Sequence, residues 1–469
     1  MSSPLPPRLA PYLEESTPLM ELARRFTAAG HSLYLVGGWL RDAISGRDLD
    51  GNDTDLATSA RPDDITAVLD GWADHLWLQG KRFGTVGAQH GDLSIEITTF
   101  RSDVYHSESR KPEVQFGDDI ETDLSRRDFT VNAMALALPQ LDFTDPFDGL
   151  ADLAARRLRT PLSVDVSFLD DPLRMLRAAR FTASLGFEPD ADVVAAMEQH
   201  RERLEIVSAE RIRDELDKLL VVPDPQPGLW LLARTGLSDQ FLPELNAMQL
   251  EQDPIHRHKD VLAHTIAVVA NTRPELRVRL AALLHDIGKP RTRGFAAGGV
   301  TFHHHEVVGA RMARERLTAL RYPNEMIDDV VALVALHLRF HTYRMGWTDS
   351  AVRRYVRDAG PLLDDLNHLT RCDCTTRNQK KAATLSRRMD ELEARIAELR
   401  GQEELARIKP PLDGREVMEL LAIPPSAIVG KALAFLLEER LERGPIAEDD
   451  ARKLLFAWAR EQGIVVPHD

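Results

Sequence analysis

The alternation of apolar and polar residues that is typical of half-buried β-strands is confined to the first third of this 469-residue chain. Short apolar or alternating runs of this kind occupy residues 32–36, 55–57, 86–89 and 93–100. From Pro172 onward, apolar residues recur instead at the spacing of amphipathic helices, as in residues 209–220. The sequence therefore predicts a mixed α/β head in about the first 150 residues, followed by a mainly α-helical remainder.

Composition narrows the class of protein. The chain is too long to fold around one hydrophobic core of ordinary size, so two to four domains are expected. Its 43% hydrophobic and 28% charged residues are typical of a soluble globular protein, with no apolar run long enough to span a bilayer and no signal peptide. The two cysteines, Cys372 and Cys374, form neither a zinc ribbon nor a disulfide scaffold, which favours the cytoplasm. A net charge of −15 argues against nucleic acid only weakly, because one groove can still be basic.

A glycine turn between an expected strand and an expected helix is the first candidate binding site. Gly37 and Gly38 follow the apolar residues 32–36, and the helix is expected to begin at Trp39. Glycines let the backbone approach a phosphate closely, and a helix N-terminus offers free N–H groups. A Gly-Gly turn alone is most often only a turn, so its function depends on the residues that follow.

Two aspartates at the start of the next expected strand form the second candidate site. Asp53 and Asp55 are two residues apart, so their side chains share one face of a strand. Two adjacent carboxylates repel each other, and Mg²⁺ relieves that repulsion and prefers oxygen ligands. Glu96, in the expected strand 94–99, supplies a third carboxylate. Two metal ions held in this way activate a 3′-hydroxyl and stabilise leaving pyrophosphate; the alternative is a solvated loop.

The glycine turn and the aspartate pair are followed along the chain by the string RRDFTVNAM at residues 126–134. Together they resemble the polymerase-β-like nucleotidyltransferases of the CCA-adding and bacterial poly(A) polymerase family, over roughly the first 220 residues. The resemblance implies that Asp53 and Asp55 bind two Mg²⁺ ions and act in catalysis with Glu96. It also implies a nucleotide site, whose triphosphate part is the glycine turn and whose residues are Gly37, Gly38, Arg41, Arg127, Asp128 and Asn132.

The string DDPLRMLRAARF at residues 170–181 resembles the base-reading helix of that family. The resemblance implies that Asp171 and Arg174 face the base, since residues three apart share a helix face, and that Arg177 and Arg180 continue the row. Arginine only donates hydrogen bonds and aspartate only accepts them, which matches cytosine and adenine. Uracil or guanine would leave buried groups unpaired, at about 1–3 kcal/mol each. The alternative is an ordinary solvated helix; the family usually has Glu-Asp in place of Asp170-Asp171.

A further segment, residues 208–216, resembles the family motif that braces this helix. Ser208 is expected to cap a helix N-terminus, and Glu210 is expected to pair locally with Arg213 or Asp214.

A second set of candidate metal ligands lies in the helical half of the chain. The string HDIGK at residues 285–289 resembles the HD superfamily of metal-dependent phosphohydrolases. The resemblance implies four core ligands and two extra ligands of two-metal members, namely His264, His285, Asp286 and Asp373, then His305 and His337. Imidazole with carboxylate suits Mn²⁺, Fe²⁺, Ni²⁺ or Zn²⁺, so the identity of this second divalent metal stays open. His303 and His304 are expected to be loop neighbours, and a purely structural helical body is the alternative.

Two segments near the end of the chain suggest RNA contact. Five basic side chains lie within residues 371–388, namely Arg377, Lys380, Lys381, Arg387 and Arg388. Beside a polymerase head such a run can contact phosphates, although a solvated helix face is the ordinary explanation. Residues 412–417 and 430–433 also resemble the family's tail, which holds the elbow of tRNA.

The expected organisation has four parts: a nucleotidyltransferase head (1–160), a helical neck with the base-recognition helix (161–252), an HD body (253–375) and a helical RNA-binding tail (376–469). The resemblance implies addition of CCA to the 3′ end of tRNA from CTP and ATP, with release of pyrophosphate and a secondary HD phosphohydrolase activity. The alternatives are a poly(A) polymerase, an A-adding or CC-adding specialist, or an HD phosphohydrolase whose head only binds. The expected partners are tRNA, CTP and ATP and no membrane, and the oligomeric state stays open.

Overall fold

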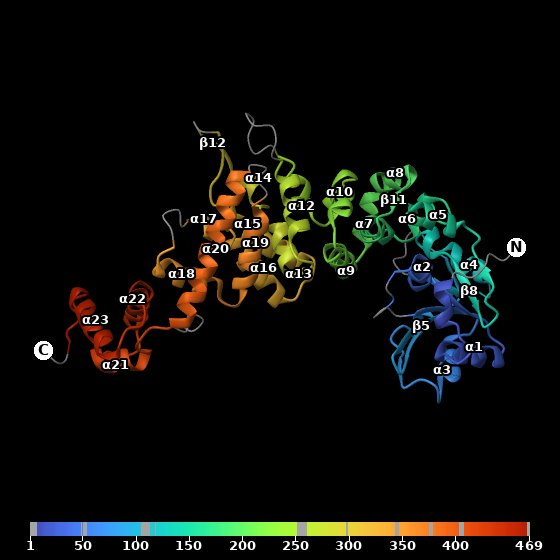
Figure 1. The fold of residues 1–469 in the computed structure, drawn as a ribbon, viewed down its shortest axis with the longest axis horizontal. Coiled ribbons are helices and arrows are strands. Elements are labelled where there is room, and N and C mark those ends of the chain that lie inside the picture. Colours follow the sequence, from blue (N-terminus) through green and yellow to red (C-terminus); the bar gives the residue numbers. More distant parts are fainter. Residues whose placement is uncertain are drawn as a thin grey trace. The chain divides into compact units, whose positions relative to one another are not determined.

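The computed structural model describes most of the chain, namely residues 7–47, 49, 54–104, 113–117, 119–250, 260–296, 299–342, 347–374, 379–402 and 408–466. It divides into two compact units, Met1–Asn246 and Ala247–Asp469 (Figure 1). The large sheet belongs to the first unit and the second is mainly helical, which confirms the predicted fold class. None of the described helices is long and apolar enough to cross a membrane.

A seven-stranded mixed sheet forms the centre of the first unit, in the order β3-β4-β5-β2-β1-β8-β9. Its strands are β1 (Leu33–Val36), β2 (Thr54–Thr58), β3 (His75–Trp77), β4 (Thr85–His90), β5 (Leu93–Thr99), β8 (Ala135–Leu138) and β9 (Phe143–Thr144). Neighbours β2 and β5 run parallel, and the other neighbouring pairs are antiparallel. Strand β3 is therefore one free edge of this sheet.

One face of the sheet is covered by helices α1 (Pro18–Ala28) and α3 (Pro62–Leu69). The alternation along β5 follows from this cover, because Ile95 and Ile97 are fully buried whereas Glu96 between them is exposed. Helix α2 (Gly37–Ser45) begins directly after β1 and packs beside β2. The face opposite α1 and α3 therefore carries the polar side chains of β2 and β5.

The rest of the first unit is built from short elements and a helical neck. The short elements are η1 (Pro7–Tyr12), η2 (Lys81–Phe83), the hairpin of β6 (Arg101–Val104) and β7 (Glu113–Phe116), α4 (Ile120–Ser125), η3 (Thr130–Asn132) and α5 (Gly149–Ala155). The neck contains β10 (Arg157–Leu158), α6 (Val164–Asp170), α7 (Leu173–Leu185), β11 (Glu188–Pro189), α8 (Ala191–His200), η4 (Arg201–Ile206), α9 (Ala209–Leu220), α10 (Gln226–Arg234), η5 (Leu237–Gln240) and α11 (Pro243–Ala247). Helix α7 packs against both α9 and α10.

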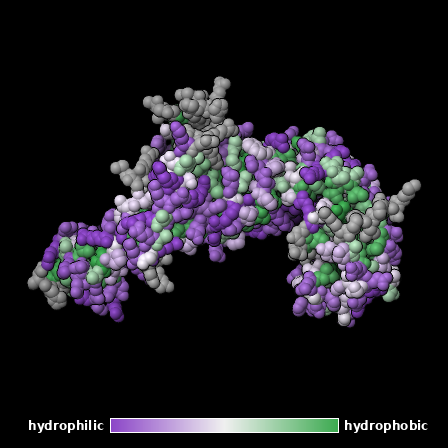
Figure 2. All heavy atoms as spheres, viewed as in Figure 1, coloured by the Kyte–Doolittle hydropathy of each residue, from purple (hydrophilic) through white to green (hydrophobic). Residues whose placement is uncertain are grey.

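The second unit contains a helical body with a small hairpin. Its elements are α12 (Val261–Asn271), α13 (Leu276–Leu284), α14 (Lys289–Thr292), β12 (Arg293–Ala296), β13 (Gly299–Phe302), α15 (His305–Ala319), α16 (Asn324–Leu336), α17 (Arg339–Thr342), α18 (Asp349–Ala359), η6 (Gly360–Leu362), α19 (Leu363–Asp373) and α20 (Gln379–Gln402). The antiparallel β12–β13 hairpin was not expected from the helical pattern. Figure 2 shows hydrophilic residues over the face of α20 that is turned to the viewer.

Three further helices end the described chain, namely α21 (Gly414–Leu421), α22 (Ala427–Arg443) and α23 (Glu448–Glu461). They enclose a small apolar core that includes Val417, Leu436 and Leu455. Arg353 of α18 joins them to the body, because its buried guanidinium donates to the Leu441 carbonyl at 3.2 Å.

Candidate active site and metal centre

Asp55 and Glu96 are direct neighbours across the parallel strands β2 and β5. Residues in register on adjacent strands point to the same face, so the two carboxylates share the face opposite α1 and α3. Asp53, the other predicted metal ligand, lies outside the described residues. Two carboxylates on one open sheet face provide the oxygen ligands that a divalent cation prefers, so the residues present fit Mg²⁺.

The glycine turn lies directly against this carboxylate face. Gly37 has a φ of 71°, and a Cβ added there would lie 2.8 Å from Asp55 Oδ2 and 3.3 Å from Arg127 Nη1. Any side chain at this position would therefore displace the Asp55 carboxylate or the Arg127 guanidinium. A Cβ at Gly38 would meet only more distant atoms, 3.6 Å from Arg41 Nη2. The structure thus brings together the glycine turn, a carboxylate and two arginines.

A buried hydrogen-bonded network joins α2, η3 and α7 beside that turn. Arg41 Nη1 donates to Asn132 Oδ1 at 2.6 Å, and Asn132 Nδ2 donates to Asp128 Oδ1 at 2.9 Å. Arg177 Nε donates to Asp128 Oδ2 at 2.8 Å. Burial raises the pKa of Asp128, but the charge of Arg177 and the hydrogen bonds from Asn132 and Arg177 outweigh it and hold the pKa below its usual range. Four of the predicted nucleotide-binding residues therefore form one connected cluster.

Two buried carboxylates that the sequence interpretation missed support the predicted arginines. Asp123 binds both Arg126 and Arg127, with Arg127 Nη2 at 3.0 Å, and it is 1% exposed. Glu215 of α9 accepts from Arg180 Nε at 2.7 Å and is 4% exposed. The signal for Asp123, which lies in α4, was its spacing of three and four residues from two arginines directly after that helix. Glu215 lay within the bracing segment 208–216, in which only local pairing was expected.

Local expectations in that segment were met in part. Ser208 caps α9 by accepting from the Arg211 amide, as predicted. Arg213 pairs with Asp214, with Nη2 at 2.9 Å from Oδ1. The contact that binds α9 to α7 is instead the Glu215 interaction with the α7 arginines.

Asp171 and Arg174 do not lie on one helix face. Asp171 is the residue before Pro172, and its backbone is extended, with φ −135° and ψ 94°, because a following proline disfavours the α conformation. Its carboxylate accepts from Arg211 Nη2 at 3.2 Å. Arg174, inside α7 and 9% exposed, donates to Ser167 Oγ at 2.8 Å and to the Arg126 carbonyl. The expected side-by-side pair is therefore absent from the contacts of the described residues.

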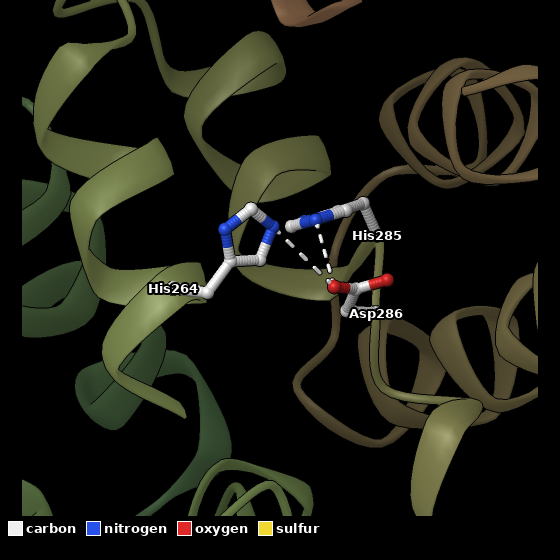
Figure 3. Close-up of side chains that lie close together, drawn as sticks. All are labelled: His264, His285 and Asp286. Carbon is white, nitrogen blue, oxygen red and sulfur yellow. Dashed lines mark ion pairs between the residues drawn. The ribbon is translucent and has the colours of Figure 1, made fainter. Parts of the chain in front are cut away.

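The predicted HD ligands converge in the second unit from five helical segments. Three carboxylate–imidazole distances are centred on Asp286: His264 Nε2 to Oδ2 is 3.6 Å, His285 Nε2 to Oδ2 is 3.2 Å and His305 Nε2 to Oδ1 is 3.3 Å. Figure 3 shows His264 and His285 turned toward Asp286. His337 Nε2 lies 4.0 Å from Asp286 Oδ1, and Asp373 Oδ1 lies 2.9 Å from His264 Nε2.

The orientation of three of these imidazoles fits a metal site. The Nδ1 atoms of His285, His305 and His337 lie 2.7, 2.8 and 2.7 Å from the carbonyl oxygens of Ala282, Phe302 and Val334. A carbonyl only accepts, so Nδ1 carries a proton and Nε2 is the atom that each ring presents to the centre. These three buried Nε2 atoms make no hydrogen bond within the described structure. Backbone-oriented imidazoles with inward lone pairs are characteristic of metal-ligating histidine.

The electrostatics of this centre favour a cation. Burial opposes a charged imidazole at His285, but Asp286 and Asp373 outweigh that effect and raise its pKa to about 10. Burial and the charge of His285 lower the pKa of His337 to about 4. Lys289 Nζ also lies 2.6 Å from Asp286 Oδ2. His304, as expected, is outside the cluster and its side chain is 83% exposed.

Gly288 explains part of the HDIGK string. A Cβ at this position would lie 2.2 Å from the His305 carbonyl oxygen. Only glycine therefore allows α14 to pack against α15, which brings His305 close to Asp286.

The predicted basic run is only partly described. Arg377 lies outside the described residues, as does the side chain of Lys381. Lys380 is exposed on α20, Arg387 lies 3.6 Å from Glu391, and the Arg388 guanidinium stacks 5.2 Å from the Phe340 ring centroid.

The fold and the two sites define a nucleotidyltransferase head combined with an HD-type metal centre. Residues 33–159 match the family described as the Poly A polymerase head domain, residues 186–249 match the probable RNA and SrmB-binding site of polymerase A, and residues 261–399 match the HD domain. The chain is 37% identical to the A-adding tRNA nucleotidyltransferase of Deinococcus radiodurans, over 73% of this chain and 80% of that protein. It therefore belongs to the family of CCA-adding enzymes and related tRNA nucleotidyltransferases.

Further relatives differ in the nucleotides that their names specify. The CCA-adding enzyme of Geobacillus thermodenitrificans is 34% identical over 67% of this chain and 68% of that protein. The CC-adding enzyme of Thermus thermophilus is 35% identical over 72% and 77%. Among solved structures, the Bacillus stearothermophilus CCA-adding enzyme in complex with CTP shares the fold, with a TM-score of 0.67 at 24% identity over 97% of this chain and 99% of that chain.

Proposed function

We propose that this chain adds CCA to the 3′ end of tRNA, using CTP and ATP and releasing pyrophosphate. The observation that carries this proposal is the in-register pair Asp55 and Glu96 beside the Gly37 turn. The names of the relatives support the tRNA substrate, since they include A-adding, CC-adding and CCA-adding enzymes. A solved structure of similar fold, the Thermotoga maritima CCA-adding enzyme, is described as complexed with tRNA and has a TM-score of 0.57.

In this proposal the reaction is an in-line displacement at the α-phosphate. The RNA 3′-oxygen forms a bond to the α-phosphorus, and the bond from that phosphorus to the bridging oxygen of the β-phosphate breaks. Asp53 and Asp55, with Glu96, would hold Mg²⁺, which supplies charge stabilisation for the attacking and leaving oxygens. Gly37 and Gly38 bring backbone close to the triphosphate, and cations at this turn favour its negative charge.

Arg41 and Arg127 are the cations proposed to contact the triphosphate. Arg41 is held by Asn132 and Asp42, and Arg127 is held by Asp123, so both guanidinium groups have fixed orientations. Fixed donors lose little conformational freedom on binding, which favours precise placement of the α-phosphate. Asp128 and Asn132 act in this proposal as the supports of that geometry.

Selection of C and A is proposed to depend on Asp171 and Arg174, with Arg177 and Arg180 behind them. The Asp171 ion pair with Arg211 is at the surface, where the Arg211 side chain is 54% exposed. Such a pair is weak, so an incoming base can replace Arg211 as the partner of Asp171. Arg174 would exchange its hydrogen bond to Ser167 for a base acceptor.

Incubation with tRNA that lacks its 3′ terminus, with CTP and ATP separately and together, tests this function. Two C residues followed by one A would support the proposal. Addition of A alone, of CC alone or of a long A tail would assign the chain to the A-adding, CC-adding or poly(A) activity. Absence of any addition with Mg²⁺ would contradict nucleotidyl transfer.

The second unit supports a second candidate function, phosphohydrolysis at the HD centre. The observation that favours it is the set of three buried Nε2 atoms turned toward Asp286. A divalent metal held there would supply an activated water, which suits a phosphate ester substrate. Conversion of 2′,3′-cyclic nucleotides to nucleoside 2′- or 3′-monophosphates, compared between wild type and His285→Ala, tests this activity; equal rates would leave the centre a structural one.

We also propose the four-part division into residues 1–160, 161–252, 253–375 and 376–469. The family matches support its first two boundaries, because they separate a head at 33–159, a neck segment at 186–249 and an HD domain at 261–399; the HD match extends past residue 375 into the proposed tail. Limited proteolysis with identification of the released fragments tests these boundaries.

A further inference from the structure

Four positions form a row across the open face of the head sheet. Asp55 on β2 is in register with Glu96 on β5, Glu96 with Gly87 on β4, and Gly87 with Trp77 on β3. Residues in register on neighbouring strands point to the same face, so the row runs from the candidate catalytic carboxylates to the free edge. Trp77, at its end, therefore faces the same side of the sheet as the proposed reaction.

The indole of Trp77 lies on that face and is partly exposed in the described part of the chain. Trp77 is 41% exposed, whereas large aromatic residues are usually well buried. A Cβ at Gly87 would lie 3.2 Å from Trp77 Cε3 and 3.5 Å from Trp77 Cβ, so the ring rests over the bare backbone of Gly87. Glycine thus lets the indole lie close to the sheet while another part of the ring stays open to a ligand.

The surroundings of Trp77 include hydroxyls and a cation, beside the exposed apolar side chains of Leu78 and Phe83. Thr85 and Thr98 are in register two residues along from Gly87 and Glu96, so they point to the same face. Their hydroxyl groups are hydrogen-bonded to each other at 3.0 Å. Beyond the end of β3, Phe83 is 46% exposed and the Arg82 guanidinium stacks 4.5 Å from its ring centroid. Exposed aromatic rings among hydroxyls and arginine are typical of surfaces on which single-stranded nucleic acid stacks. A protein partner would call for a continuous apolar surface on this face, whereas the row next to Trp77 presents the hydroxyls of Thr85 and Thr98.

We propose that Trp77 stacks on a base of the RNA acceptor strand close to its 3′ end and so directs that end toward Glu96 and Asp55. This inference rests on the proposed nucleotide addition to RNA. Neighbouring strands are about 4.8 Å apart, so Trp77 lies about 10 Å from Glu96 across the sheet. That separation corresponds to about three nucleotides stacked at about 3.4 Å each.

The test compares two single variants, Trp77→Ala and Leu76→Ala, with the wild-type chain. Leu76 belongs to the same edge strand and is 38% exposed, but it points to the opposite face, which makes it a matched control. Two readouts are taken: the KM for a tRNA transcript that lacks its 3′ terminus, and the fluorescence of 2-aminopurine placed third from the 3′ end of a transcript that ends in CC, which matches the spacing of about three nucleotides between Trp77 and Glu96. The KM for CTP is measured alongside.

We expect Trp77→Ala to raise the KM for RNA about 5- to 150-fold, the range of one base–aromatic stack, and to leave the KM for CTP within about twofold. Quenching of 2-aminopurine in the wild type should weaken in this variant and persist in Leu76→Ala. Trp77→Phe should retain most of both effects because it keeps a stacking ring.

An unchanged KM for RNA together with unchanged quenching in Trp77→Ala would overturn the inference, as would equal losses in Leu76→Ala. If the wild-type chain adds no nucleotide to RNA, the proposed function fails. The fluorescence readout does not depend on catalysis, so it still decides in that case whether Trp77 stacks on RNA.

Discussion

Asp128 and Arg177 form an ion pair at the junction of head and neck, with Arg177 Nε 2.8 Å from Asp128 Oδ2. The carboxylate side chain is 8% exposed and the guanidinium side chain 32% exposed. Removing one partner of such a pair leaves the other charge buried and uncompensated, which costs more than the pair itself contributes.

Arg177→Ala should therefore destabilise the first unit by on the order of 2–3 kcal/mol, less than a fully buried pair because Arg177 is partly exposed. Urea unfolding followed by a probe in the first unit measures the effect. Arg25→Ala, which removes a surface pair with Glu21 at 3.4 Å, is the control and should change the unfolding free energy by less than about 0.5 kcal/mol. Equal effects of the two variants would contradict a structural role of Asp128 and Arg177.

The same pair predicts a pH dependence of stability. The pKa of Asp128 is lowered in the folded state, so the stabilisation is fully present above the unfolded value of about 4 and is lost as the pH falls through the lower folded value. The difference in unfolding free energy between wild type and Asp128→Asn should be largest at neutral pH and shrink below about pH 4. Denaturant unfolding at pH 7 and at pH 3 measures it, and a difference that grows on acidification would show that the sign is wrong.

Asp55→Asn should abolish most nucleotide addition without unfolding the head. The carboxylate lies on the open face of the sheet beside Glu96, so its loss weakens charge stabilisation of the reacting phosphate more than it affects the core. We expect a fall in kcat of at least about 100-fold. Asp70→Asn, an exposed carboxylate of the same unit, serves as the control and should keep wild-type activity.

The sequence predicted the elements of this site better than their side-chain contacts. Alternation in residues 93–100 predicted a half-buried strand, and in β5 this alternation leaves Glu96 exposed between the buried Ile95 and Ile97. The pairing of β2 with β5 joins strands about 40 residues apart. No local pattern specifies such a non-local register, so the row that ends at Trp77 could only be seen in the fold.

Asp171 and Arg174, the proposed base-reading pair, show where sequence spacing misled. Asp171 and Arg174 are three residues apart, but Pro172 takes Asp171 out of the helix, so helical geometry does not apply to the pair. The HD ligands show the opposite case. Their identities came from resemblance. The backbone carbonyls that orient the rings of His285, His305 and His337 lie near the ends of α13, β13 and α16, and no residue pattern predicted these contacts.

Metal content should separate the roles of the HD ligands. His264, His285 and Asp286 form one possible ligand group, and Asp286, His305 and His337 form another, with Asp286 shared. After loading with Mn²⁺ and dialysis, His305→Ala should retain about half of the wild-type metal and Asp286→Ala almost none. His304→Ala, an exposed neighbour, should bind as much as the wild type. Equal retention in His305→Ala and the wild type would remove His305 from the ligand set.

Asp171→Ala should blunt base selection while leaving triphosphate binding intact. Asp171 is proposed to accept from the amino group of cytosine or adenine, and the phosphate-binding arginines lie on other segments of the chain. The ratio of CTP to UTP incorporation should therefore fall about 5- to 150-fold, as expected for one hydrogen bond of about 1–3 kcal/mol. Arg211→Ala removes the surface partner of Asp171 seen here and is the matched control. The Arg211→Ala variant should keep the selectivity for CTP, because the Asp171 carboxylate is still present. A loss of selectivity in Arg211→Ala but not in Asp171→Ala would assign base reading to Arg211 instead.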